Sequence, residues 1–169
     1  LKISVCILTK NSAATLAQTL DSTLGFDEVL LLDNGSTDNT LQIAERYPHC
    51  NIHTSPFIGF GPLHNLAGTL AKNDWLFSLD SDEVISNELL VEIRSLSLKA
   101  YHVYTMPFKN FYKGQWIKHG GWYPDYHTRL YNKTETHFSD AHVHEKILTE
   151  KSTCITLKGH IHHFSYACI

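Results

Sequence analysis

The chain has 169 residues, of which 43% are hydrophobic and 18% are charged, and its formal net charge is -3. A chain of this length buries about two thirds of its unfolded surface in one domain, so it needs neither a metal nor disulfides simply to fold. The small negative charge creates no field that would favour nucleic acid, which argues against a polyanion-binding role.

The four cysteines are scattered, and no two of them form a C-x-x-C pair. Such spacing suggests neither a zinc ribbon nor a disulfide scaffold, and it fits a reducing cytoplasm. No stretch approaches the roughly 18 continuous apolar residues of a membrane span, so we expect a soluble protein. The chain starts on Leu1 and stops within a strand-like segment, and we expect one domain over residues 1–169 that is truncated at its C-terminus.

Three hydrophobic runs without alternation predict strands. Each run is bounded by polar turn residues, as expected of strands that are buried on both faces of a parallel sheet. The runs are KISVCILT (2–9), DEVLLLD (27–33) and DWLFSLD (74–80).

Helical patterns follow the first two runs, at residues 12–24 and 36–47, and the second begins with residues that cap helices. A further helix is predicted over residues 86–96, capped by Ser86, and a strand over residues 101–108. The pieces that follow are short and rich in aromatics, glycine and histidine, which predicts loops and antiparallel strands. This order indicates an α/β domain with a more irregular second half.

Polar residues stand at the C-terminal ends of the three predicted strands. In an open α/β sheet this edge is where ligands bind, because loops and helix N-termini converge there. Asp and Asn also begin turns for purely structural reasons, but three such clusters on one edge favour a binding site. The clusters are Thr9, Lys10 and Asn11, then Asp33 and Asn34, then Asp80 and Asp82.

The segment SLDSDE concentrates the carboxylates of Asp80, Asp82 and Glu83 after a hydrophobic strand. Burying this charge would be costly without a cation, and hard oxygen ligands suit Mg²⁺ or Mn²⁺, which would neutralise a diphosphate. The segment HVHEKI places His142 and His144 on the same side of a predicted strand, and His144 is a candidate third ligand. Chance pairing among twelve histidines is the alternative.

A second group of histidines, His160, His162 and His163, resembles a zinc tract of a metal hydrolase. No Cys or Glu completes a set at ligand spacing, so we interpret this group as a strand with polar outward positions. Nearby, Trp122 and Tyr123 lie in a glycine-rich loop and can stack on sugar faces, although aromatics also fill cores.

Taken together, five segments resemble glycosyltransferase family 2 and, within it, the bacterial lipopolysaccharide inner-core β-glucosyltransferases that act on heptose. The similarity covers nearly the whole chain in the family's order, and HGGWYPD is its most restricted element. The segments are ISVCILTKN, DEVLLLDNGSTDNT, GFGPLHNLA, DWLFSLDSDEVIS and HGGWYPDYHTRLY.

The resemblance implies the GT-A fold, an α/β/α sandwich with a mostly parallel sheet that binds nucleotide-diphospho-sugars. It implies inverting, metal-dependent transfer of a hexose, with glucose favoured, from UDP to a lipopolysaccharide-core or related glycan acceptor, at the inner face of the cytoplasmic membrane. It also implies residue roles: Thr9, Asn11 and Asp33 for the nucleotide, and Asp80 and Asp82 for the sugar diphosphate and Mn²⁺ or Mg²⁺. Beside these we expect Asn65 to contact the donor, His144 to be a metal ligand, and Trp122 and Tyr123 to bind the acceptor.

Within HGGWYPDY, Asp125 is the candidate general base. Inversion requires attack from the face opposite the departing UDP, so a carboxylate must stand near the acceptor hydroxyl. Gly120 and Gly121 leave room for a sugar, and Pro124 stiffens the frame around the acid. The alternative is that Asp125 pairs with Arg129 only to hold a loop.

A hypothesis from another class is a non-catalytic nucleotide-sugar or glycan-binding module with a degenerate GT-A fold. It is motivated by the short C-terminus and by Pro62 and His64, which stand where relatives tend to carry basic or amide residues. Binding of UDP would not separate the two hypotheses, whereas acceptor-dependent release of UDP would.

Overall fold

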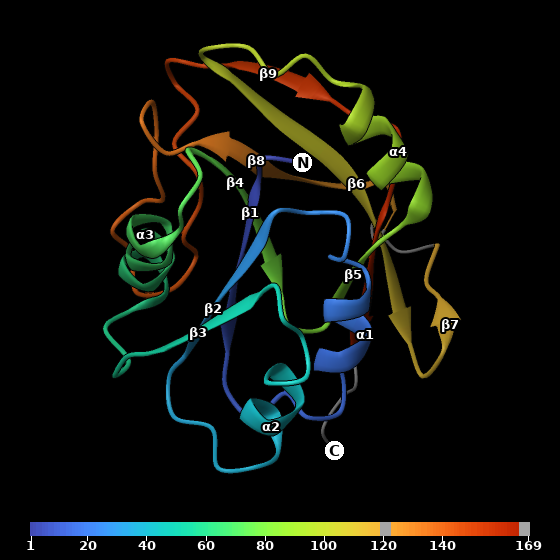
Figure 1. The fold of residues 1–169 in the computed structure, drawn as a ribbon. Coiled ribbons are helices and arrows are strands. Elements are labelled where there is room, and N and C mark those ends of the chain that lie inside the picture. Colours follow the sequence, from blue (N-terminus) through green and yellow to red (C-terminus); the bar gives the residue numbers. More distant parts are fainter. Residues whose placement is uncertain (119–122, 166–169) are drawn as a thin grey trace.

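The computed structural model describes residues 1–118 and 123–165, which form a mixed sheet with helices on both faces (Figure 1). This confirms the predicted α/β class. In chain order the elements are β1 (Ser4–Thr9), α1 (Leu16–Asp21), β2 (Glu28–Asp33), α2 (Thr40–Ala44), β3 (Cys50–Thr54), α3 (Phe60–Leu70), β4 (Trp75–Asp80), β5 (Glu83–Ile85), α4 (Asn87–Ser95), β6 (His102–Tyr112), β7 (Gln115–Trp116), β8 (Asp125–Asn132), β9 (Thr153–Thr156) and β10 (Ile161–Ser165).

The main path of the sheet runs β3-β2-β1-β4-β8-β6-β10-β5. The strands β3, β2, β1 and β4 are parallel, whereas β8 is antiparallel to both β4 and β6. The carboxyl ends of the parallel strands therefore meet, with Thr9 opposite Asp33 and Leu8 opposite Asp80. The prediction that the polar clusters share one edge is confirmed.

The core lies in two hydrophobic layers, one on each face of the sheet. Figure 1 shows α3 on one side of the strands and α1 and α4 on the other. Every residue of β2 is buried, and alternate leucines serve the two layers: Leu31 packs with the α1 and α4 side, Leu30 and Leu32 with α3. Burial on both faces explains why this strand is hydrophobic without alternation.

The helices α1 and α2 are shorter than the predicted segments 12–24 and 36–47. Short polar side chains bond the backbone around their N-termini and compete with helical hydrogen bonds. The carboxylate of Asp38 accepts from the backbone N–H of Thr40 at 3.0 Å, and Thr40 Oγ1 accepts from the N–H of Ser12 at 2.8 Å. By contrast, the predicted Ser86 cap of α4 is confirmed, because its hydroxyl accepts from the N–H of Leu89 at 3.2 Å.

The helix α3 is not evident from the sequence, because its two glycines lower helix propensity. Pro62 lies in the first turn, where a missing N–H is tolerated. Gly61 meets the loop of residues 139–141 so closely that a Cβ there would lie 2.0 Å from the carbonyl oxygen of Ser139. The helix is therefore set by tertiary packing rather than by local preference.

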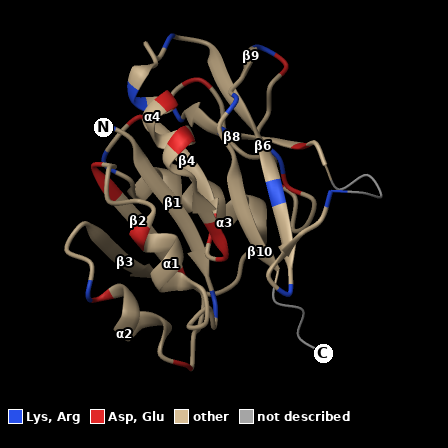
Figure 2. Cartoon of the chain, turned by 90° about the vertical axis from the view of Figure 1, so that its right-hand side faces the viewer, with Lys and Arg blue, Asp and Glu red and all other residues tan. Residues whose placement is uncertain are grey.

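Figure 2 shows Lys and Arg interspersed with Asp and Glu over the face it presents, in keeping with the weak net charge. The described helices include none that is both long and apolar enough to cross a membrane. In the described residues Cys6, Cys50 and Cys154 are free thiols.

Candidate functional site

The loop after β4 is built on a buried ion pair. Glu83 is only 2% exposed, and its two carboxylate oxygens lie 2.6 and 3.1 Å from the guanidinium nitrogens of Arg129. The same carboxylate accepts from the backbone N–H of Asp80 at 2.7 Å, and Arg129 also donates to the carbonyl of Ser78 at 3.0 Å. These bonds fix the loop and leave the side chain of Asp80 half exposed, 3.8 Å from Arg129.

The charges of this pair depend on each other. Burial would lower the pKa of Arg129, but Glu83 and Asp80 attract its proton and raise that pKa above its usual range. Burial also raises the pKa of the Glu83 carboxyl, and the adjacent guanidinium opposes that shift. Because both groups are desolvated, removing one would leave the other as an uncompensated buried charge.

The alternative that Arg129 pairs with Asp125 is wrong. The pairing of β8 with β6 shifts register beside Tyr104 and Thr105, which leaves an extra residue, Arg129, on β8. Such bulges re-aim side chains. The guanidinium lies over the ring of Phe108 at 4.8 Å and reaches the end of β4 instead.

Asp125 is held from two sides. Its Oδ1 lies 3.0 Å from Nε2 of His127, and its Oδ2 accepts from the side-chain amide of Asn110 at 3.1 Å. The carboxylate stays 36% exposed, so it is oriented yet reachable. Of the predicted stiff frame, the Tyr123–Pro124 peptide is cis, whereas Gly120 and Gly121 lie outside the described residues.

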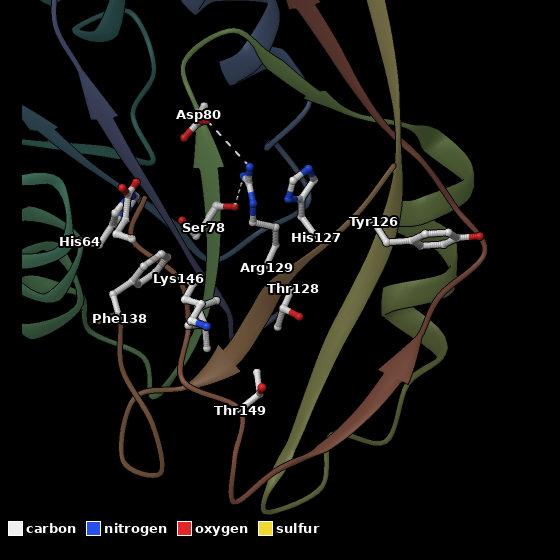
Figure 3. Close-up of a pocket in the computed structure, with 12 residues that line it drawn as sticks. His64, Ser78, Asp80, Tyr126, His127, Thr128, Arg129, Phe138, Lys146 and Thr149 are labelled. Atoms are coloured by element: carbon white, nitrogen blue, oxygen red, sulfur yellow. Dashed lines mark hydrogen bonds and ion pairs between the residues drawn. The ribbon is translucent and has the colours of Figure 1, made fainter. Parts of the chain in front are cut away.

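Two adjacent cavities share Asp80 and His64 in their walls. The first, of about 310 Å³, also contacts His127, Arg129 and Phe138. Figure 3 shows His64 and Phe138 on one side of it, with His127 and Arg129 opposite and Asp80 at one end. The second cavity, of about 360 Å³, continues past Asp80 to Ser81, Val143 and His144. The first acidic residue of the D-x-D pair thus lies between two spaces that can hold a ligand.

The structure does not bring together the predicted metal ligands Asp82 and His144. His144 faces the cavity of Asp80, in a loop with a positive φ of 58° rather than in the expected strand. The histidine beside Asp82 is His163, whose Nε2 lies 3.1 Å from Oδ2 of Asp82. The reason is topological, because β10 pairs with β5 so that His163 stands opposite Glu83.

The strand predicted for the second group of histidines is confirmed as β10, but His163 is partly buried against Asp82 instead of pointing outward. Hydrogen bonding to Asp82 raises its pKa above the usual value for histidine. Within residues 1–118 and 123–165, no group of three metal-ligating side chains is assembled. Asp82 and His163 are a carboxylate and an imidazole at hydrogen-bond distance, with Asp80 in the same loop as Asp82.

The predicted donor residues Asn11 and Asp33 build the loop after β2. Asp33, 2% exposed, accepts from the backbone N–H groups of Gly35 and Ser36, each at 3.0 Å. Asn11, at a positive φ of 52°, accepts from the N–H of Thr37 at 2.7 Å. Their contact with a nucleotide stays a prediction.

Thr9 lies next to this loop, at the end of β1. It is buried, and its hydroxyl finds no hydrogen-bond partner among the described residues. A buried hydroxyl without a partner is a site where a polar ligand would be stabilised.

Asn65 does not line the cavities that contain Asp80. Its amide donates to the carbonyl of Phe138 at 3.0 Å and accepts from the N–H of Phe138 at 2.9 Å, so it braces the segment that closes one wall. The neighbouring His64 faces the cavities instead, stacked on Phe138 at 4.1 Å and 3.4 Å from Glu145. Burial lowers the pKa of His64.

The predicted acceptor aromatics are only partly described. The hydroxyl of Tyr123 lies 3.1 Å from Nε2 of His160, and its ring meets Trp116 edge-on at 5.1 Å. Trp122 lies outside the described residues. Sugar stacking by either residue stays a prediction.

Comparison with known proteins gives one family. The model of "Glycosyl transferase family 2" matches residues 4–153. An uncharacterized glycosyltransferase, RP128, of Rickettsia prowazekii is 30% identical over 97% of this chain and 60% of its own. The chain thus spans about 60% of the length of this curated relative.

Two solved structures have similar folds. The Staphylococcus aureus TarS fragment 1–349 in complex with UDP-GlcNAc has a TM-score of 0.69 at 19% identity, over all of this chain and 60% of that one. The Mycobacterium tuberculosis glucosyl-3-phosphoglycerate synthase, in complex with Mn²⁺, UDP and glucosyl-3-phosphoglycerate, has a TM-score of 0.51 at 22% identity, over 64% and 44%.

Proposed function

The chain belongs to glycosyltransferase family 2 and has the GT-A fold of its structural neighbours, and on this premise we propose an inverting transfer of a hexose from a UDP-sugar. The observation that carries the proposal is the exposed carboxylate of Asp125, oriented by His127 and Asn110 on the strand next to the D-x-D strand. A module that only bound nucleotide-sugar would have no need for an aimed base.

The chemistry assigned to Asp125 follows from its position. The acceptor oxygen forms a bond to the anomeric carbon while the bond from that carbon to the diphosphate oxygen breaks, and the hydroxyl proton passes to Asp125. The bond from His127 stabilises the carboxylate in one orientation, so the acceptor hydroxyl meets a preorganised base. The donor is proposed to lie at the ends of β1, β2 and β4, where Thr9 offers its unpaired hydroxyl.

A divalent cation, Mn²⁺ or Mg²⁺, belongs to the proposal. The chemistry of the residues fits, because a carboxylate, Asp82, and an imidazole, His163, lie 3.1 Å apart, and Asp80 precedes Asp82 in the same loop. Such an ion would neutralise the charge of the leaving diphosphate. A neighbour of the same fold holds Mn²⁺ together with UDP, which supports this part of the proposal.

The finer identity of the substrates rests on the resemblance of HGGWYPD and its flanking segments. We propose glucose as the sugar and a lipopolysaccharide inner-core or related glycan as the acceptor. Action on such an acceptor would place the protein in the cytoplasm, in peripheral contact with the inner face of the membrane.

The test uses the purified protein with Mn²⁺, a panel of UDP-sugars and defined lipopolysaccharide cores. The expected result is release of UDP that depends on the acceptor and is fastest with UDP-glucose, with an inverted anomeric centre in the product. Tight UDP binding without acceptor-dependent release from any sugar would instead support the non-catalytic binding module.

A further inference from the structure

We infer that Asn110 is a positioning residue that holds the acceptor-side carboxylate and the D-x-D loop in one frame. The effect of Asn110 on catalysis rests on the proposed function. The inference comes from four consecutive hydrogen bonds that connect the two halves of the site, and no local sequence pattern indicates them.

The connection starts at His127 and ends at Asp82. Nε2 of His127 lies 3.0 Å from Oδ1 of Asp125, and the amide of Asn110 donates to Oδ2 of Asp125 at 3.1 Å. On its other side, Oδ1 of Asn110 lies 2.9 Å from Nδ1 of His163, and Nε2 of His163 lies 3.1 Å from Asp82. Asn110 therefore touches both the proposed base and the β10 histidine that contacts the D-x-D loop.

The hydrogen-bond chemistry of these groups fixes the direction of each bond. An ionised carboxylate only accepts, so Asn110 must turn its NH₂ group toward Asp125. Its carbonyl oxygen then faces His163 and requires a proton on Nδ1 of that ring. The bond to Asp82 requires a proton on Nε2 as well, so the ring that makes both bonds is the imidazolium. When the Nε2 proton leaves, Asn110 keeps the proton on Nδ1, and Nε2 is the nitrogen that would face a cation.

The sheet makes this arrangement rigid. Asn110 stands on β6, which lies between β8 and β10, and it is opposite His163 in the register with β10. Two residues earlier on β6, Phe108 is opposite Asp125. Asn110 is 7% exposed, so its bonds compete little with water. A central strand thus sets the separation between the groups that act on donor and acceptor.

The first experiment separates positioning from simple packing. Asn110→Ala removes the bonds to Asp125 and His163, and we expect kcat for UDP release to fall roughly 10- to 100-fold, with the KM for UDP-glucose within about twofold of the parent. The matched control is Asn51→Ala, on the edge strand β3, which removes the 2.8 Å bond from the Asn51 amide to Glu28 of β2 and is expected to leave kcat unchanged. If Asn110→Ala loses only thermal stability and keeps the parental kcat per folded molecule, the inference is overturned.

The second experiment needs no turnover. In ¹⁵N-labelled protein the ring signals of His163, assigned with His163→Gln, are expected to shift in Asn110→Ala and in Asp125→Ala but not in Asn51→Ala. Unchanged ring signals in Asn110→Ala would overturn the inference. If the signals shift but the parent releases no UDP with any sugar or acceptor, the proposed function fails while the connection stands.

Discussion

At the scale of single residues, the acid Asp125 decides whether the site is catalytic. Asp125→Asn keeps the size of the side chain but removes the base, so we expect kcat to fall roughly 10² to 10⁴-fold with UDP-sugar affinity nearly unchanged. Initial rates of UDP release, together with calorimetry of UDP binding, measure the two effects separately. Asp74→Asn, at an exposed acid of another loop, is the control. Near-parental turnover of Asp125→Asn would assign the base elsewhere.

The two candidate metal histidines make opposite predictions. His163 touches Asp82, whereas His144 lies in the loop across the cavity. We therefore expect His163→Gln, like Asp82→Asn, to abolish the increase in UDP affinity that Mn²⁺ produces, and His144→Gln to retain it. Titration of UDP with and without Mn²⁺ tests this. If His144→Gln lost the Mn²⁺ effect and His163→Gln kept it, His144 would be the metal ligand.

At the scale of elements, the ion pair of Glu83 and Arg129 joins β5 and β8. Arg129→Met leaves a buried carboxylate without its partner, so we expect the free energy of unfolding to fall by about 3–5 kcal/mol. The double variant Glu83→Leu with Arg129→Met should recover part of that loss, because no unpaired charge remains. Urea denaturation at neutral pH measures both. A double variant less stable than Arg129→Met would show that the pair is not the source of the loss.

The loop between β2 and α2 has a structural dependence on Asp33. Asp33→Ala removes three hydrogen bonds made by Gly35 and Ser36, and we expect the free energy of unfolding to fall by about 1–3 kcal/mol. We also expect the variant to bind uridine and UDP more weakly than the parent, by the same factor for both. If Asp33→Ala lost UDP binding but still bound uridine, Asp33 would instead contact the phosphates. If the variant were as stable as the parent, Asp33 would not stabilise the loop.

At the scale of the whole molecule, buried histidines make stability depend on pH. Burial holds the pKa of His64 below the ordinary 6.5, so the folded state binds that proton less readily than the unfolded state. This contribution is present above pH 6.5 and is lost as the pH falls toward and below the folded pKa. His64→Gln should therefore narrow the difference in unfolding free energy between about pH 7.5 and about pH 5.5. If the pH dependence of the unfolding free energy were unchanged or larger in His64→Gln, His64 would not be a source of that dependence.

The sequence alone determined the features that depend on neighbouring residues in the chain. Unbroken apolar runs mark β1, β2 and β4, because strands covered on both faces have no polar side, and the polar residues that end them fall on one edge. The sequence motifs also identified Asp80, Asp82 and Asp125 as candidate site residues. The edge strand β3 and the glycine-containing helix α3 could not be predicted from the sequence, because their local conformational preferences are weak and tertiary packing determines them.

Only the tertiary structure decided which side chains meet. The partner of Arg129 depends on a bulge in β8, the histidine beside Asp82 depends on where β10 enters the sheet, and the role of Asn110 depends on β6 lying between two other strands. These contacts join residues such as Asp82 and His163 that are 81 positions apart. Sheet order and register set such contacts, and a local pattern carries no information about a partner chosen at that separation.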